Sequence, residues 1–216
     1  MIEKAWNWNN ISNNYWEIPD EYMYYLVQRW KDQNRTKILD LGCGIGRHSL
    51  LFAKNDYDVT AVDISQSGLD KVKSISNEQK LNIKTILANI TSLPLQDNEM
   101  DSIIAFNSIY HTDKNGFKKA ISEMYRILKT NSEAFLTLLS KADPSYENVP
   151  QDKIIDKNTI MKKEEDGTEL PHFFVDYEEI YEIFKEFQII SIKEITEFFN
   201  SKRHVHFNIL VRLEEK

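Results

Sequence analysis

The sequence predicts an α/β fold in which a mostly parallel sheet is covered by helices on both faces. Short apolar runs of strand length alternate with stretches of helical periodicity between residues 37 and 139, and this alternation is typical of a doubly wound sheet. A glycine-rich turn at residues 42–46 joins the first run to the helical stretch after it. The length of 216 residues fits one domain, so we expect a single domain over residues 1–216.

Each element is predicted from its apolar pattern and its end signals. Pro19 opens the first helix at a position where a missing N–H does no harm, Ser65 is expected as an N-cap, and Asp176 with Glu179 resembles a capping box. We expect helices at 19–31, 46–54, 66–77, 114–129 and 177–186. We expect seven strands, at 37–41, 58–62, 82–87, 101–106, 133–139, 187–198 and 204–213. The last two leave no room for a helix between them, so they should form a C-terminal antiparallel hairpin at the sheet edge.

Two segments fall outside this alternation. Residues 1–16 are rich in tryptophan and asparagine without any period, and with the first helix they are interpreted as a lid covering residues 1–35. Residues 141–174 are polar and contain three prolines, and none of the predicted strands or helices falls within them. A connection of this length is usually functional or disordered, so we interpret it as a connection on the substrate side of the site.

Bulk composition disfavours several classes of function. Hydrophobic residues make up 41% and charged residues 28% of the chain, which is ordinary for a globular protein. The formal net charge of −7 argues against a nucleic-acid partner, because polyanions usually select a basic surface. The N-terminus does not resemble a signal peptide, and no apolar stretch is long enough to span a membrane. The single cysteine, Cys43, fits a cytoplasmic location, and nothing indicates an oligomeric state.

The glycine turn carries the strongest functional signal. Gly42, Gly44 and Gly46 lie between an apolar strand and a helix, a unit that brings backbone N–H groups and a helix N-terminus close to a ligand. Roughly twenty residues later Asp63 ends a second apolar run, where an acidic side chain suits the two hydroxyls of a ribose. The pattern indicates a cofactor that contains a nucleoside.

The spacing of the glycines favours S-adenosylmethionine (SAM) as this cofactor. The dinucleotide fingerprint G-x-G-x-x-G would need a third glycine where Arg47 stands, whereas here it comes one residue early. Asp40 stands just before the turn, where a carboxylate would repel a pyrophosphate but suit a cationic amino group. SAM has such an amino group, a sulfonium and no phosphate. The pattern G-x-x-x-x-G-K-[ST] does not occur, which disfavours a nucleoside triphosphate.

Residues 37 to 140 resemble the SAM-binding half of class I methyltransferases, of the type that acts on small molecules. The similarity is carried by Asp40, the three glycines, Asp63, Ala88-Asn89-Ile90, Leu93-Pro94-Leu95, Asp97–Asp101, Ser102–Tyr110 and Glu123–Lys129. It implies a Rossmann-like fold with SAM as cofactor. The residues that would bind SAM are Asp40, Gly42, Gly44, Gly46, Asp63, Ile64, Asn89, Ile90 and Asn107.

Several of these assignments have a plainer alternative. Asn89 stands where the family often has an aspartate, and its side-chain carbonyl can still accept from the adenine amino group. Ile64 and Ile90 would sandwich the adenine ring or simply pack in the core. Asn107 would contact the methionine end. Arg47 either pairs with the methionine carboxylate or is a solvated charge at the helix end.

The acceptor side is inferred from the tip of the fourth strand, the N-terminal aromatic residues and the polar connection. His111 is the candidate general base or substrate contact, with a surface or capping histidine as the alternative. Tyr110 would contact the methionine portion or the substrate, or pack. Tyr15 and Trp16 would close over the sulfonium by cation–π attraction or act as a hydrophobic staple. His172, at the end of the connection, would line the substrate pocket.

The sequence predicts no metal ion. His204 and His206 are two residues apart, so they share one face of a strand, and this spacing permits a metal site. No third ligand is evident beside them, so we expect the pair to have another role.

These observations predict a SAM-dependent methyltransferase. It would transfer the sulfonium methyl group to a small-molecule acceptor by in-line displacement, with the protein orienting the two reactants and excluding water. Three alternatives stay open: a module that holds SAM without catalysis, a nucleotide-dependent oxidoreductase, and an RNA methyltransferase. Nothing in the sequence identifies the acceptor atom.

Overall fold

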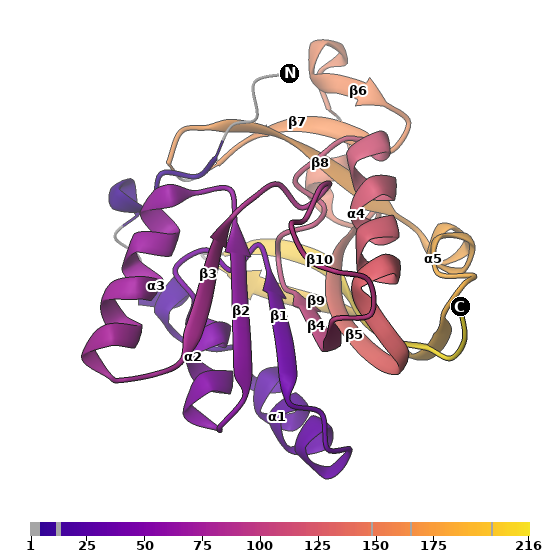
Figure 1. Cartoon of the computed structure of the whole chain (residues 1–216). Coiled ribbons are helices and arrows are strands. Elements are labelled where there is room, and N and C mark those ends of the chain that lie inside the picture. The colour runs from indigo at the N-terminus through magenta and orange to yellow at the C-terminus, as the bar shows by residue number, and fades with distance from the viewer. Residues whose placement is uncertain (1–4, 12–13, 148, 165, 200) are drawn as a thin grey trace.

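The computed structural model describes residues 5–11, 14–147, 149–164, 166–199 and 201–216. At its centre, neighbouring strands follow the order β3-β2-β1-β4-β5-β10-β9 (Figure 1). Strands β1 to β5 pair in parallel, whereas β10 pairs antiparallel with both β5 and β9. The strands are β1 (Lys37–Leu41), β2 (Asp58–Asp63), β3 (Ile83–Leu87), β4 (Met100–Ala105), β5 (Leu128–Ser140), β9 (Gln188–Phe199) and β10 (Lys202–Leu213).

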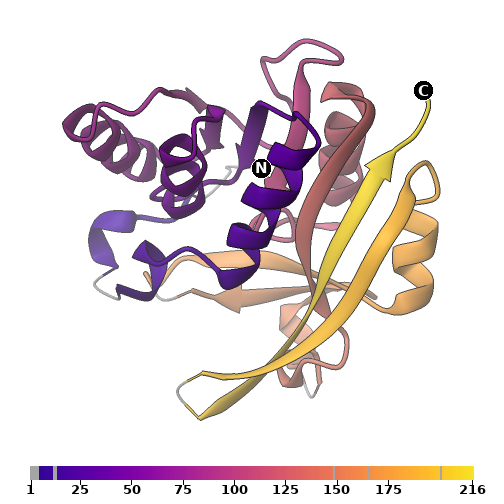
Figure 2. The ribbon, with the colours of Figure 1, turned by 90° about the horizontal axis from the view of Figure 1, so that it is seen from below.

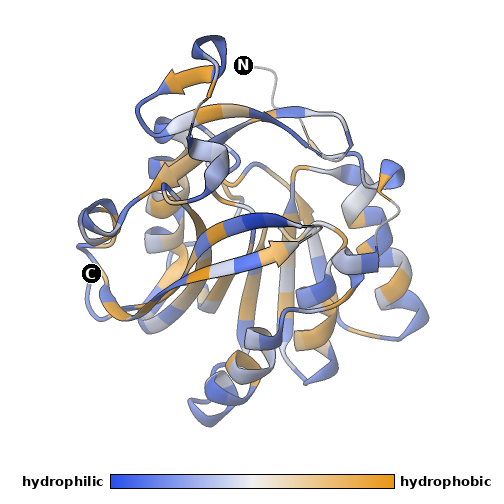
Figure 3. Ribbon diagram, turned by 180° about the vertical axis from the view of Figure 1, so that it is seen from behind, coloured by the Kyte–Doolittle hydropathy of each residue, from blue (hydrophilic) through white to orange (hydrophobic). Residues whose placement is uncertain are grey.

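Helices cover both faces of this sheet (Figures 1 and 2). The helices are α1 (Glu21–Asp32), α2 (Arg47–Lys54), α3 (Gln66–Glu78), α4 (Lys114–Ile127) and α5 (Tyr177–Ile183). Ile104 packs in the cluster of α1 and α2, while its neighbours Ile103 and Ala105 pack in the cluster of α4 and α5. The central strands are accordingly rich in apolar residues (Figure 3). None of the described helices is long and apolar enough to cross a membrane.

The end signals in the sequence correctly identify the starts of α3 and α5, whereas α1 begins at Glu21 and Pro19, predicted to open it, lies before its N-cap. Asp20 caps α1, Ser65 caps α3, and Asp176 with Glu179 forms the capping box that opens α5. Most predicted boundaries differ by up to three residues, and the largest difference is that β5 begins at Leu128, directly after α4, and not at 133. Leu128 is fully buried and already pairs with β4, so the strand needs no intervening loop.

Residues 141–174 form three antiparallel strands, where the sequence predicted no regular element. They are β6 (Ile154–Asp156), β7 (Thr159–Lys163) and β8 (Glu169–Val175), and they raise the strand count of the described chain from the predicted seven to ten. These strands were not predicted because charged residues in β7 resemble a loop and because β8 contains Pro171. Proline has no backbone N–H to donate, so it is tolerated in a strand only where no such hydrogen bond is needed. β8 joins the end of β5 at the pairs Leu139–Phe174 and Ser140–Val175. In Figure 1, β7 and β8 cross above the carboxyl ends of β1 and β2.

The C-terminal strands form the predicted antiparallel hairpin. β10 pairs with β5 along most of its length, and β9 follows as the edge strand of the main sheet. The closed end of the hairpin extends beyond the neighbouring strands (Figure 2).

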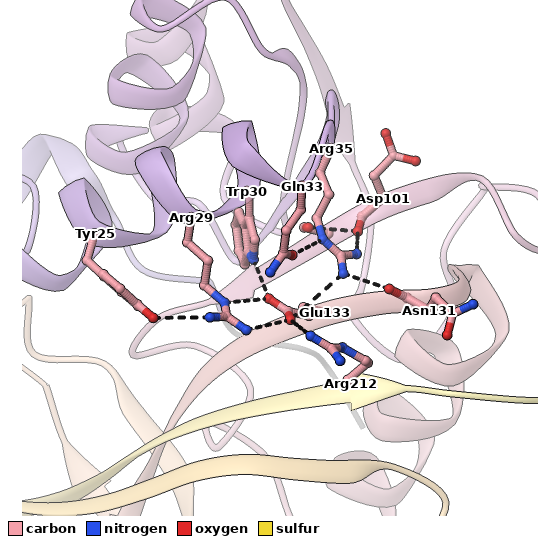
Figure 4. Close-up of polar contacts among 10 residues, drawn as sticks. Tyr25, Arg29, Trp30, Gln33, Arg35, Asp101, Asn131, Glu133 and Arg212 are labelled. Atoms are coloured by element: carbon pink, nitrogen blue, oxygen red, sulfur yellow. Dashed lines mark hydrogen bonds and ion pairs between the residues drawn. The ribbon is translucent and has the colours of Figure 1, made fainter.

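A buried carboxylate fastens α1 to the sheet at the end opposite the glycine turn (Figure 4). Glu133 in β5 accepts hydrogen bonds from Arg29 Nε and Nη2 at 2.9 and 2.8 Å and from the Trp30 indole N–H at 2.9 Å. Arg212 in β10 donates to the same carboxylate at 2.8 Å, and Arg35 lies 3.8 Å away. Although burial raises the pKa of Glu133, these hydrogen bonds outweigh it and lower the pKa to about 2.

Candidate functional site

The glycine turn lies at the carboxyl end of β1 and is held there by Asp63, the last residue of β2. The backbone N–H of Gly44 donates to Asp63 Oδ2 at 2.7 Å, and that of Ser65 donates to Oδ1 at 2.7 Å. Asp63 is buried, and this burial raises the pKa of its carboxyl group. Each carboxylate oxygen keeps a second lone pair, so Asp63 can accept two further hydrogen bonds from a ligand.

Asp40, the last acid before the turn, is buried beneath it. Its Oδ2 accepts hydrogen bonds from the backbone N–H and the hydroxyl of Ser49, at 3.0 and 2.6 Å, which ties the end of β1 to the first turn of α2. Burial outweighs these bonds and raises the pKa of Asp40 to about 6. Asp63 raises it slightly further and Arg47 opposes the shift. Asp40 therefore titrates close to neutral pH.

Gly44 leaves room for the indole of Trp8. A Cβ at Gly44 would lie 2.6 Å from that ring, and the φ of +55° also favours glycine. The backbone N–H of Trp8 donates to Ser67 Oγ at 3.1 Å, and its carbonyl accepts from Lys71 Nζ at 2.8 Å. The N-terminal segment is thus tied to α3 and covers the glycine turn.

Tyr15 and Trp16 lie against Arg47 at the start of α2. The guanidinium carbon of Arg47 is 5.2 Å from the Tyr15 ring centroid and 5.3 Å from that of Trp16. Its Nη1 donates to the carbonyls of Tyr15 and Ile18 at 3.2 and 3.1 Å. Arg47 is only 8% exposed, so its interpretation as a solvated charge is wrong. It anchors the N-terminal segment.

The residues predicted for adenine lie at the ends of β2 and β3. Ile64 and Ile90 are half-buried, and Ile90 packs against the core shared with α4 and α5. Asn89 Oδ1 accepts from both the N–H and the hydroxyl of Thr91, each at 2.8 Å. Since these bonds occupy both lone pairs, the Nδ2 group is the part of Asn89 that is left for a ligand.

The tip of β4 is held by contacts to its neighbours. Asn107, at a φ of +51°, donates its backbone N–H to Thr137 Oγ1 at 2.7 Å, and its Oδ1 accepts from the same hydroxyl at 3.0 Å. Tyr110 is buried, and burial raises the pKa of its phenol. The Tyr110 carbonyl accepts from the N–H of Phe173 at 2.8 Å, which joins this tip to β8.

His111 and His172, which are far apart in the sequence, meet above this tip. Their ring centroids are 4.8 Å apart, and His172 Nε2 lies 2.8 Å from Oε1 of Glu164. Burial, followed by the neighbouring His172 and Lys162, holds the pKa of His111 well below its usual range. His111 is therefore a neutral imidazole at physiological pH, and it is half-buried, not a surface histidine.

Trp6 connects the acceptor side to the cofactor side. Its ring stacks on that of His111 with centroids 6.2 Å apart, and its carbonyl accepts from Ser65 Oγ at 2.6 Å. Its indole N–H is buried and has no hydrogen-bond partner among the described residues. A buried donor of this kind usually indicates a ligand or water that would complete it.

The structure thus gathers two groups of residues that the sequence singled out. Asp40, the glycines and Asp63 form one group, and Tyr110, His111 and His172 form the other. Sequence reasoning missed Trp6, Trp8 and Glu164. The aromatic N-terminus pointed to the two tryptophans in general terms, but nothing distinguished Glu164 within its charged run.

The match to known families agrees with this geometry. Residues 38–131, from β1 into β5, match the methyltransferase domain family. Over this part of its length, the chain is similar to methyltransferases. An uncharacterized protein of Methanocaldococcus jannaschii is 29% identical over 147 residues, which cover 68% of this chain and 60% of that protein. A ubiquinone biosynthesis O-methyltransferase of Rickettsia felis is 23% identical over 150 residues, which cover 63% of this chain and 60% of that protein.

The fold of the chain also agrees with solved structures. A SAM-dependent methyltransferase of Methanosarcina mazei superposes with a TM-score of 0.74 at 17% identity, covering 92% of this chain and all of that one. The alignments with the two curated relatives span 60% of the length of each.

Proposed function

We propose that this methyltransferase transfers a methyl group from SAM to a small-molecule acceptor by in-line displacement. The observation that carries the proposal is the contact between Gly44 and Asp63, which sets a buried carboxylate beside a glycine turn at the ends of two parallel strands. Arg47, the cation next to the turn, is committed to two backbone carbonyls, which favours SAM over a ligand with phosphates.

The residues of the turn suit the parts of SAM. Asp63 would accept from both ribose hydroxyls, since each of its oxygens has a lone pair to spare. Ile64 and Ile90 would flank the adenine ring, and Asn89 would donate to it through Nδ2. The carboxylate of Asp40 favours a nearby ammonium group, and Asn107 would contact the methionine end. When bound, SAM supplies a methyl group on a sulfonium that is already activated.

We further propose that the segment around Trp6 and Trp8, within the predicted lid, covers bound cofactor and excludes water. This proposal is supported by the hydrogen bonds that join the segment to Ser65, Ser67 and Lys71, in and just before α3. Tyr15 and Trp16 hold the segment through Arg47 and would reach the acceptor from the same side.

The acceptor would enter beside Tyr110, His111 and His172, under the β7–β8 strands. A small molecule fits the closed, aromatic character of this side, and the net charge of −7 disfavours nucleic acid. A ubiquinone biosynthesis enzyme among the relatives also supports a small acceptor. We propose a cytoplasmic location because the only cysteine, Cys43, is buried and unpaired.

Calorimetric titration tests this function. SAM and its demethylated product should each bind with a dissociation constant on the order of micromolar, or about 8 kcal/mol of binding free energy. Tryptophan emission should change in the same titration, since Trp6 and Trp8 lie over the turn. Folded protein that binds neither compound would refute the proposal. Binding without transfer of labelled methyl groups to any metabolite of a cell extract would favour a non-catalytic SAM-binding module.

The affinity for SAM is expected to fall as the pH is lowered through 6. Asp40, whose pKa is raised to about 6, attracts the SAM ammonium only when ionised, so affinity should be constant above that pH and decrease below it. The decrease approaches about tenfold per pH unit well below the pKa. Calorimetry between about pH 5 and pH 7.5 measures this. Asp40→Asn should flatten the curve; an unchanged curve would assign the titration to Asp63, whose pKa is also raised.

A further inference from the structure

Three side chains with metal-binding atoms converge between β4, β7 and β8. His111 follows β4, Glu164 follows β7, and His172 lies in β8. One ligand atom from each lies within 4.8 Å of the other two, and the closest pair, His172 Nε2 and Glu164 Oε1, is 2.8 Å apart. Two imidazoles and a carboxylate are a common ligand set for zinc and for non-haem iron.

The contacts of His172 leave a lone pair on its Nε2 atom, which faces Glu164 and requires a cation there. His172 Nδ1 lies 3.0 Å from the carbonyl oxygen of Leu170, which can only accept, so Nδ1 carries the proton. Nε2 then presents a lone pair to Glu164 Oε1, which is also an acceptor when ionised. The pair therefore needs a proton or a metal ion beside these two atoms. An N–H donated to a backbone carbonyl is also the outer contact that metal-bound histidines usually make.

His111 completes the group from the tip of β4. Its ring is fixed between Tyr110, whose centroid is 4.6 Å away, and Trp6. Donor atoms around a zinc ion, each at about 2.1 Å from it, lie roughly 3 to 4 Å apart. The His172–Glu164 pair, at 2.8 Å, is slightly closer than this spacing, and the group as a whole, within 4.8 Å, is slightly wider, so shifts of about 1 Å or less would bring the three atoms to one ion. The surrounding aromatic rings restrict water, which favours direct ligation.

We propose that His111, Glu164 and His172 bind one divalent transition-metal ion, such as Zn²⁺, beside the entry of the acceptor. The three protein ligands would leave a fourth position open, as in catalytic zinc sites. This differs from the sequence expectation of no metal, which considered only His204 and His206. The convergence of three distant segments was not visible in the sequence.

The role of the metal in methyl transfer rests on the proposed function. An acceptor hydroxyl or thiol would take the open position in place of water, and the ion would lower the acceptor pKa so that its proton passes to solvent. The resulting anion would form its new bond to the methyl carbon with its own lone pair, while the electrons of the broken carbon–sulfur bond stay on sulfur. The metal would thus do the work first assigned to His111 as a general base.

Zinc binding by the untagged full chain tests the site without any need for SAM. We expect one equivalent of Zn²⁺ after dialysis, and a Co²⁺ derivative with the visible absorption of a four- or five-coordinate site. Glu164→Gln keeps the shape of the side chain and should weaken zinc binding at least about tenfold. His172→Ala should abolish the Co²⁺ spectrum, with circular dichroism to verify folding.

His204→Ala is the matched control, because His204 belongs to the other histidine pair and lies on the edge hairpin. It should leave zinc stoichiometry and the Co²⁺ spectrum unchanged. Less than a tenth of an equivalent of zinc in the unaltered chain, or zinc that is lost with His204 and retained in Glu164→Gln, would overturn the proposal.

The two proposals fail in different ways. A chain that binds SAM but no zinc refutes the metal site and leaves the methyltransferase function standing. A chain that binds zinc but neither SAM nor its product refutes the function and leaves the metal site standing. With both sites filled, a chelator should reduce methyl transfer while SAM affinity changes less than about threefold.

Discussion

Replacing Asp63 with alanine is expected to weaken SAM binding at least about 100-fold. The two hydrogen bonds that the carboxylate would accept from the ribose hydroxyls are charge-assisted, and each contributes about 1.5–3 kcal/mol. Asp63→Ala also releases the N–H groups of Gly44 and Ser65, which lowers the free energy of unfolding by about 1–3 kcal/mol. Calorimetry measures the affinity, and circular dichroism verifies that the variant is folded.

Asp58→Ala is the matched control for this experiment. Asp58 is an exposed aspartate at the amino end of the same strand, β2, far from the glycine turn. Its replacement should change SAM affinity less than about twofold. Asp63→Asn keeps the shape of the side chain but not its charge. Its affinity for SAM should lie between those of Asp63→Ala and Asp58→Ala. Equal affinities in Asp63→Ala and the unaltered chain would refute the ribose contact.

Replacing Glu133 with alanine is expected to lower the free energy of unfolding by about 2–4 kcal/mol, because it removes a fully buried acceptor and leaves the half-buried Arg29 and Arg212 without their partner. Arg29, Trp30 and Arg212 all donate to this carboxylate, whose side chain is fully buried. Urea unfolding followed by circular dichroism measures the loss. A decrease below about 1 kcal/mol would mean that the three donors find water instead.

The same carboxylate should control stability in acid. The pKa of Glu133 is lowered from 4.5 to about 2, so it stabilises the fold above pH 4.5 and loses this contribution as the pH falls through 2. The shift corresponds to roughly 3 kcal/mol. In Glu133→Gln the decrease in unfolding free energy over this window should be smaller by that amount. Glu214→Gln, an exposed glutamate after β10, should behave as the unaltered chain.

The cofactor side could be predicted because its signals are local. A strand, three glycines and a helix start lie within one short stretch, and the acid that completes them ends the next strand. Such units fold the same way wherever they occur. The alternation of apolar runs indicated the doubly wound architecture for the same reason, and the caps of α3 and α5 followed from Ser65 and from Asp176 with Glu179.

The acceptor side could not be predicted because it is built by long-range contacts. Glu164 sits in a charged run that resembles a solvated loop, yet β7–β8 pairing brings it to His172. Trp8 touches the glycine turn, whereas the rings of Tyr15 and Trp16 lie against Arg47. The periodicity of a sequence does not indicate which of several aromatic residues will face a given loop.

The attachment of β8 to the sheet has a consequence for how such enzymes diversify. The register of β8 with β5 consists of two residue pairs at the very end of that strand, Leu139–Phe174 and Ser140–Val175. The β6–β8 unit could therefore be lengthened, shortened or exchanged while the main sheet and its glycine turn keep their shape. The proposed acceptor site predicts that chimeras that graft this unit between related chains change the choice of acceptor with little effect on the affinity for SAM.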